Sequence, residues 1–121
     1  MKSYGIFYVL AFVSDLQRSK AFYRDKIGCK LSTDEPRVAG LALGEGYLVL
    51  HVDEREPKQR VYGGGMTVAL QVEDAAGEHA RLTKLRVPVS KLIDQPWGER
   101  NFTFTDPDGY VWLVAQSRNL G

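Results

Sequence analysis

Few residues in this chain have the types and spacing that catalysis requires. Asp106 and Asp108 form a carboxylate pair, and such pairs can act as a general acid and a general base. The intervening Pro107 and the following Gly109 complete a turn signal, because proline fixes φ near about −65° and glycine tolerates positive φ. Turn formation explains both aspartates, so we expect this segment to join two strands.

The sulfur and imidazole groups are isolated from one another in the sequence. Cys29 is the only cysteine, which excludes an intrachain disulfide and any site built on several thiolates. It falls on an apolar predicted strand, where a packed thiol is expected. His79 lies on a predicted helix, away from the sheet. The glycine run 63–65 lacks the Lys-Ser/Thr of a phosphate-binding loop, and neither G-x-S-x-G nor H-E-x-x-H occurs. We therefore predict no catalytic residues.

The composition is that of one ordinary globular domain. The 121 residues are 44% hydrophobic and 26% charged, with a net charge of +1. Basic residues form no long run, so no nucleic-acid partner is expected. The longest apolar run, Ile6 to Val13, is too short to span a membrane and lacks the features of a signal peptide. We expect a cytoplasmic protein with no membrane partner.

The elements that would position a site occur in two similar series. In the first half, strands are predicted at 5–13, 29–33, 37–43 and 47–52, with a helix near 15–27 capped by Ser14 or Asp15. In the second half, strands are predicted at 66–72, 87–92, 101–105 and 110–115, with a helix near 74–86. The apolar run 5–13 is typical of a strand that is covered on both faces. The charged run 53–60 and the glycines that follow indicate a solvated connector.

An internal repeat relates the two halves. Val13-Ser14-Asp15 matches Val72-Glu73-Asp74 at an offset of 59 residues, and Gly46-Tyr47 matches Gly109-Tyr110 at an offset of 63. Each half then contains one helix and four strands. The sequence predicts an α+β fold of two βαβββ modules, about residues 5–52 and 66–116, joined by a linker at 53–65.

With the Phe22-Tyr23 pair, Gly28, and the Trp97-Gly98-x-Arg100 motif that leads into the Asp-Pro-Asp-Gly turn, this repeat resembles the vicinal oxygen chelate superfamily. That superfamily includes glyoxalases, extradiol dioxygenases and bleomycin-resistance proteins. The resemblance implies a single domain in which curved mixed sheets surround a cleft and helices cover the outer face. It also implies a homodimer, because members bury sheet edges and apolar surface by pairing modules.

The resemblance also shows where a divalent metal would bind. In metal-dependent members one ligand lies seven residues before the Asp of a Val-x-Asp motif at the end of the first strand, here Asp15 and Asp74. Another ligand lies four residues after the Gly of the Asp-Pro-Asp-Gly turn, here Gly109. These positions are Tyr8, Thr67, Leu113 and the first-module equivalent, Leu50. Two are aliphatic, so we expect no metal and no other cofactor. A register slip of one residue would bring His51 to the cleft in place of Leu50, but the Gly46-Tyr47 match argues against it.

The remaining interpretation is a pocket of apolar and aromatic groups for a flat organic ligand. Tyr8 and Thr67 would supply hydrogen bonds, and Arg100 and Arg37 would anchor an anionic group unless each forms a surface ion pair. The predicted ligand-binding residues are Tyr8, Leu10, Phe12, Leu50, Thr67, Trp97, Arg100, Phe102, Phe104 and Leu113.

Three functions remain open on these grounds. The first is a metal-independent binding protein that sequesters an antibiotic or a planar metabolite, as in the bleomycin-resistance branch. The second is a glyoxalase-like lyase or isomerase, or a dioxygenase, with atypical metal ligands. The third is a structural or regulatory dimer whose cleft is closed.

Overall fold

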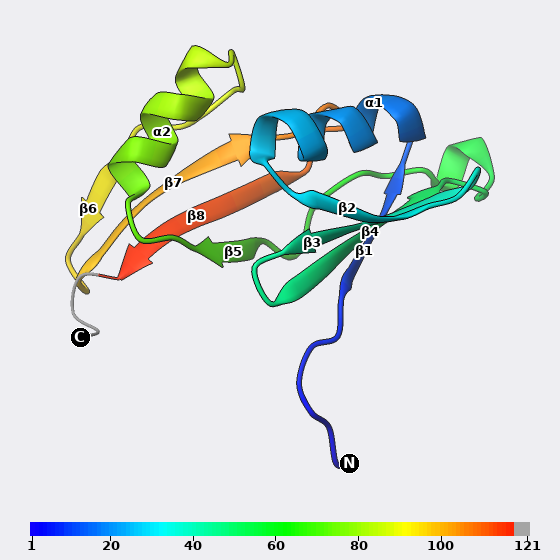
Figure 1. The fold of residues 1–121 in the computed structure, drawn as a ribbon, viewed down its shortest axis with the longest axis horizontal. Helices are drawn as coiled ribbons and strands as arrows, with labels where there is room; N and C mark the ends of the chain where they lie inside the picture. Colours follow the sequence, from blue (N-terminus) through cyan, green and yellow to red (C-terminus); the bar gives the residue numbers. More distant parts are fainter. Residues whose placement is uncertain (118–121) are drawn as a thin grey trace. The chain divides into compact units, whose positions relative to one another are not determined.

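The computed structural model describes residues 1–117 and divides the chain into two compact units, Met1–Tyr62 and Gly63–Gly121 (Figure 1). We call them module one and module two and describe each by itself. In each module a single helix accompanies one four-stranded sheet.

Module one has the sheet order β1-β4-β3-β2, in which β1 runs parallel to β4 and the other neighbours are antiparallel. The helix α1 continues as a turn of π-helix, and a short 3₁₀-helix, η2, follows the sheet. The elements are β1 (Val9–Val13), α1 (Leu16–Ala21), the π-helix η1 (Phe22–Ile27), β2 (Lys30–Asp34), β3 (Val38–Leu43), β4 (Gly46–Val52) and η2 (Pro57–Gln59).

Module two repeats this topology with the sheet order β5-β8-β7-β6, and β5 is parallel to β8. The elements are β5 (Val68–Gln71), α2 (Ala75–Lys84), β6 (Ile93–Gln95), β7 (Glu99–Thr105) and β8 (Val111–Ser117). The predicted α+β fold of two βαβββ modules is therefore confirmed.

Equivalent aspartates begin the two main helices. The Asp15 carboxylate accepts a hydrogen bond from the Arg18 amide at 3.1 Å, and the Asp74 carboxylate accepts one from the Gly77 amide at 3.0 Å. Each satisfies a backbone donor that has no partner within its helix. The first helix ends at Gly28, whose left-handed φ of 95° suits glycine.

Each sheet buries the face that packs against its own helix. Because side chains alternate along a strand, every second residue is directed to that core. On that face, the fully or largely buried apolar residues are Ala11, Val13, Ala39, Leu41, Leu48 and Leu50 in module one, and Phe102, Phe104, Trp112 and Val114 in module two. We call the opposite side of each sheet its helix-free face.

The first strand is shorter and less buried than predicted. Ile6 is 90% exposed, and β1 begins only at Val9. Within β1, Ala11 and Val13 are buried while Leu10 is partly exposed. The expectation of burial on both faces is wrong because β1 is an edge strand with a helix on one side only.

The predicted strand at 87–92 is also misplaced. In that segment Val89 forms an isolated bridge with Phe104, and β6 begins at Ile93. Pro88 has no amide proton for a ladder, although its carbonyl oxygen accepts a hydrogen bond from the Thr105 amide at 3.0 Å. Proline therefore delays the strand until the residues beyond it.

Replacing Leu50 tests this arrangement of faces. Leu50→Ala should lower the free energy of unfolding by about 2–4 kcal/mol, because it leaves a cavity beneath α1. Val49→Ala, one residue away on the helix-free face, should cost less than about 1 kcal/mol. Urea denaturation of the two variants measures the difference. Equal losses would contradict the assigned register.

Candidate functional site

The helix-free face of module one combines apolar and aromatic side chains with one imidazole. Leu10 pairs with Val49, and Phe12 pairs with His51, so all four side chains share this face. The Phe12 and His51 rings meet edge to face, with their centroids 6.1 Å apart. Leu10 and Phe12 thus lie together, as the sequence predicted.

Leu50 is not part of this face. It is 0% exposed and pairs with the buried Ala11. The sequence match was out of phase because the two hairpins differ in length: Leu43 pairs with Gly46 across two residues, whereas Thr105 pairs with Val111 across five. An odd difference in loop length transfers every aligned residue to the other face. The rejected alternative, with His51 on the face, is the one that the structure shows.

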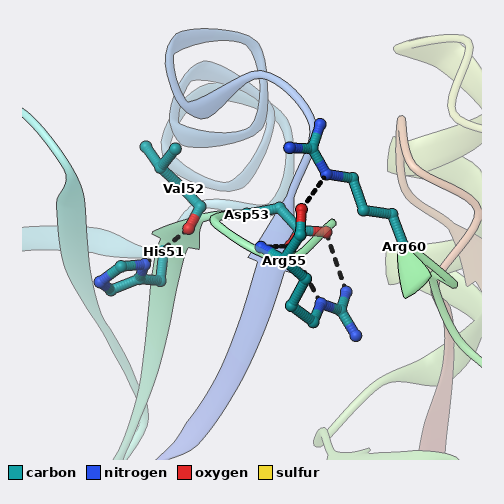
Figure 2. A network of polar contacts seen from close by, with 5 residues as sticks. All are labelled: His51, Val52, Asp53, Arg55 and Arg60. Carbon is teal, nitrogen blue, oxygen red and sulfur yellow. Dashed lines mark hydrogen bonds and ion pairs between the residues drawn. The ribbon is translucent and has the colours of Figure 1, made fainter. Parts of the chain in front are cut away.

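His51 is held so that one ring nitrogen is left as an acceptor. Its Nδ1 lies 2.7 Å from the Val52 carbonyl oxygen (Figure 2). Because a carbonyl only accepts, Nδ1 carries a proton, and in the neutral tautomer the lone pair is then on Nε2. Nε2 is 3.9 Å from the Glu54 carboxylate, which binds Arg37 at 2.6 Å. Of the two roles expected for Arg37, an anchor for an anionic ligand group or a surface ion pair, the structure shows the ion pair.

The linker begins with a buried ion pair. The Asp53 side chain is 2% exposed, and Arg55 binds both of its carboxylate oxygens, at 2.9 Å from Nε and 2.9 Å from Nη2 (Figure 2). The Arg55 amide adds a third bond at 3.0 Å. These bonds from Arg55, joined by one from Tyr62, outweigh burial and hold the pKa of Asp53 well below its usual range. The interpretation of this run as a solvated connector is wrong at its start.

Arg55 also connects the linker to the site. Its guanidinium carbon lies 4.5 Å from the centre of the Phe12 ring, within the range of a cation–π interaction. Arg60 then donates from Nε to the Arg55 carbonyl oxygen at 2.8 Å. The folded linker therefore borders the helix-free face of module one at Phe12.

The helix-free face of module two is apolar at its centre. Leu113 lies between Ala69 of β5 and Thr103 of β7, its partners in the two ladders. Thr67, just before β5, and Val111 line a hollow of about 510 Å³ together with Gly63 to Met66, Gly109 and Tyr110. Leu113 thus lies on the predicted side of the sheet, and Thr67 borders a hollow at the glycine-rich end.

Three predicted site residues lie on the other face of module two. Phe102 and Phe104 are fully buried; Phe102 contacts the His79 ring of α2 at 5.0 Å, and Phe104 stacks on Trp112 at 6.1 Å. Arg100, two residues before Phe102, lies on the same face and binds Asp94, with 2.6 Å between Nε and Oδ1. Their expected place at the wall of a ligand pocket is wrong, because β7 directs even-numbered side chains toward the helix.

Two further predicted residues lie outside the strands. Trp97 is in the turn between β6 and β7 and is 64% exposed. Tyr8 precedes β1, is partly exposed and meets the Phe7 ring at 5.1 Å. Tyr8 was expected on the first strand, and that expectation is wrong.

The remaining polar groups noted in the sequence have structural roles. The buried Asp106 carboxylate accepts hydrogen bonds from the amides of Asp108 and Tyr110, at 2.9 and 2.8 Å, and so stabilises the turn. Cys29 is buried, which raises the pKa of its thiol to about 11. A thiol of that pKa stays protonated at neutral pH and is a poor nucleophile.

The donor set does not fit the metal that the resemblance implies for enzymatic members. At the four expected positions it offers a tyrosine, a threonine and two leucines, and the helix-free face of module one adds one imidazole. Within residues 1–117, no three His, Cys, Asp or Glu side chains cluster closely enough to hold a metal ion.

The two-module fold with its helix-free faces is shared with a known class of proteins. Residues 5–114 match the model of the Glyoxalase/Bleomycin resistance protein/Dioxygenase superfamily, and the chain belongs to this family. TnmS3, an antibiotic-binding protein from a Streptomyces species, is 28% identical with a TM-score of 0.79, over 97% of this chain and 98% of that one.

Two further solved structures share the fold at lower identity. A lactoylglutathione lyase from Agrobacterium tumefaciens is 22% identical with a TM-score of 0.79, over 100% of this chain and 99% of that one. TioX from a Micromonospora species is 23% identical with a TM-score of 0.77, over 93% and 99%. These two show the fold alone. Among the helices within residues 1–117, none has the length and apolar character to cross a membrane.

The Asp53–Arg55 pair generates a pH prediction. A carboxyl group whose pKa is depressed by folding stabilises the protein above its unfolded pKa of about 4, and this contribution disappears as the pH falls toward the folded value. The loss of unfolding free energy in Asp53→Asn should therefore be greatest near neutral pH and shrink below about pH 4.

Denaturation at a series of pH values checks this. Asp25→Asn is the matched control, because Asp25 binds Arg24 on the surface, where the side chains are well exposed. It should cost little at any pH. An Asp53→Asn loss no larger than that of the control, or one that does not shrink in acid, would contradict the assigned role.

Proposed function

We propose that this protein binds a planar, largely apolar small molecule without a metal ion and thereby sequesters it. The observation that carries the proposal is the helix-free face of module two. There Leu113 stands where a metal-dependent relative is expected to have a carboxylate, and its ladder partners are Ala69 and Thr103. The side chains immediately around Leu113 form a floor that offers apolar area and no charge. The likeness to an antibiotic-binding protein agrees with it.

Module one, taken by itself, also presents features on its own helix-free face that suit an aromatic ligand. Leu10 and Val49 give apolar contact, and the edge of His51 presents Nε2 as an acceptor. Burying a flat ring on such a surface gains roughly 25 cal/mol for each Å² of apolar area removed from water. One fixed acceptor beside that area would select the orientation of the ligand.

The alternative is a glyoxalase-like lyase or isomerase, or a dioxygenase, with atypical metal ligands. The lone pair of His51 Nε2 is the observation that favours it, since neutral imidazole is a common metal ligand. Elemental analysis of the purified protein separates the two functions: stoichiometric zinc, nickel, manganese or iron would support the enzyme.

Assembly as a homodimer is part of the proposal. Several large apolar side chains of the two sheets are partly exposed, and burial of such area stabilises association. They are Leu10, Tyr47, Ile93 and Val111. Analytical ultracentrifugation should show a dimer at micromolar concentration, and a monomer throughout would overturn this part.

Thermal-shift screening against planar antibiotics and metabolites tests binding, and Trp97 fluorescence then gives the affinity. For a compound found in this way, Leu113→Glu should weaken binding roughly tenfold or more, because an unpaired charge on an apolar floor costs about 1–3 kcal/mol. The matched control is Leu85→Glu at the exposed end of α2. It adds the same charge and should leave the affinity unchanged. Equal binding by the Leu113→Glu protein would remove that face from the site.

A further inference from the structure

A relay of hydrogen bonds crosses the end of module two farthest from the glycines. The side-chain Nε2 of Gln95 donates to Asn101 Oδ1 at 3.1 Å, and the side-chain Nδ2 of Asn101 donates to Glu99 Oε1 at 2.7 Å. Asn101 pairs with Ala115, and Glu99 pairs with Ser117, so the relay lies on the same helix-free face as Leu113. Asn101 itself is 6% exposed.

The direction of this relay follows from the chemistry of its last member. An ionised carboxylate only accepts, so Asn101 must present its NH₂ group to Glu99 and keep its carbonyl oxygen for Gln95. The two amides are thereby fixed in orientation, and Asn101 holds one oxygen of Glu99 in place.

The other carboxylate oxygen is available to a ligand. Among residues 1–117, the only partner of the Glu99 carboxylate is Asn101. The neighbouring Arg100 does not neutralise it, because its side chain is directed to the opposite face and binds Asp94 at 2.6 Å. Glu99 is half-buried, which leaves a route of approach.

The carboxylate lies at a useful distance from the apolar floor. From Leu113 to Ser117, the partner of Glu99, the strand advances four residues, or roughly 13 Å. Ser117 also borders a hollow of about 480 Å³ that Gln71, Val72, Glu73 and Gln116 line. A ring system over Leu113 would therefore bring a substituent at its edge toward Glu99.

We propose that Glu99, fixed by Asn101 and Gln95, binds a protonated amine or amidinium group carried by the planar ligand. This inference rests on the proposed function and narrows it to cationic ligands. The reason is that the exposed end of the relay offers an anionic acceptor and no donor. Hydrogen bonds to ionised groups are the stronger ones and give the greater discrimination.

Three probes that share one tricyclic ring test the charge preference at neutral pH: aminoacridine as a cation, acridine as a neutral ring and acridine carboxylate as an anion. The wild-type protein should bind aminoacridine about tenfold more tightly than acridine, and the carboxylate least tightly. Fluorescence titration measures all three, and added salt should reduce the preference.

Two isosteric variants locate the effect. Glu99→Gln should bind acridine as the wild type does but lose the preference for aminoacridine. Asp94→Asn removes the same charge from the other face of the same hairpin and should retain the preference. A preference that survives in Glu99→Gln, or a wild-type preference for the anion, overturns the inference. Equal binding of all three probes overturns the inference and leaves the proposed function standing; failure of all three to bind counts against both.

Discussion

The structure depends on one constraint: each four-stranded sheet has a single helix to bury it. Alternation along the strands then divides every residue between a core face and a helix-free face. Leu41, Leu48 and Leu50 on the first sheet, and Phe102, Phe104 and Trp112 on the second, supply the apolar burial that stabilises each module. The residues between them lie on the helix-free face, where several, such as Leu10 and Val111, are partly exposed.

The sequence predicted what is decided by local signals. The first helix cap at Ser14 or Asp15, the Asp106 turn and the repeated order of elements all follow from nearby residues, and the structure agrees, with Asp15 as the cap. The face of the sheet on which a side chain lies is not decided locally, because it depends on how many residues each hairpin turn contains. The turn after Leu43 has two residues, and the connection after Thr105 has five. Residues at the same distance after the matching glycines, Gly46 and Gly109, therefore lie on opposite faces of their sheets. That single miscount exchanged Leu50 for His51. The misplacement of Phe102 and Phe104 has a related cause: aromatic type alone does not determine which face of a strand a residue occupies.

The start of the linker could not be predicted for another reason. Charged residues near proline and glycine usually indicate solvated chain, and the run 53–60 contains nothing local that contradicts this. Arg55 is only two residues from Asp53, but the ring that packs against its guanidinium comes from a distant strand. Phe12, which lies on β1 and is distant in sequence, provides the ring against which the Arg55 guanidinium packs. The same guanidinium pairs with the buried Asp53 carboxylate. A buried carboxylate is tolerated only when it is paired and hydrogen-bonded, and here one arginine satisfies both conditions.

The two modules share a topology but present different polar groups, and these groups lead to the same ligand chemistry. In module one, donation from Nδ1 to the Val52 carbonyl leaves His51 Nε2 as an acceptor. In module two, donation from Asn101 leaves one oxygen of Glu99 as an acceptor. Arg37, Arg55 and Arg100 do not offset this, since each is bound to a carboxylate of its own module. Each helix-free face therefore combines apolar area with a fixed acceptor. A planar molecule that carries hydrogen-bond donors satisfies both kinds of surface, whereas an anionic one would leave the acceptors desolvated and unpaired, at a cost that apolar contact would have to exceed.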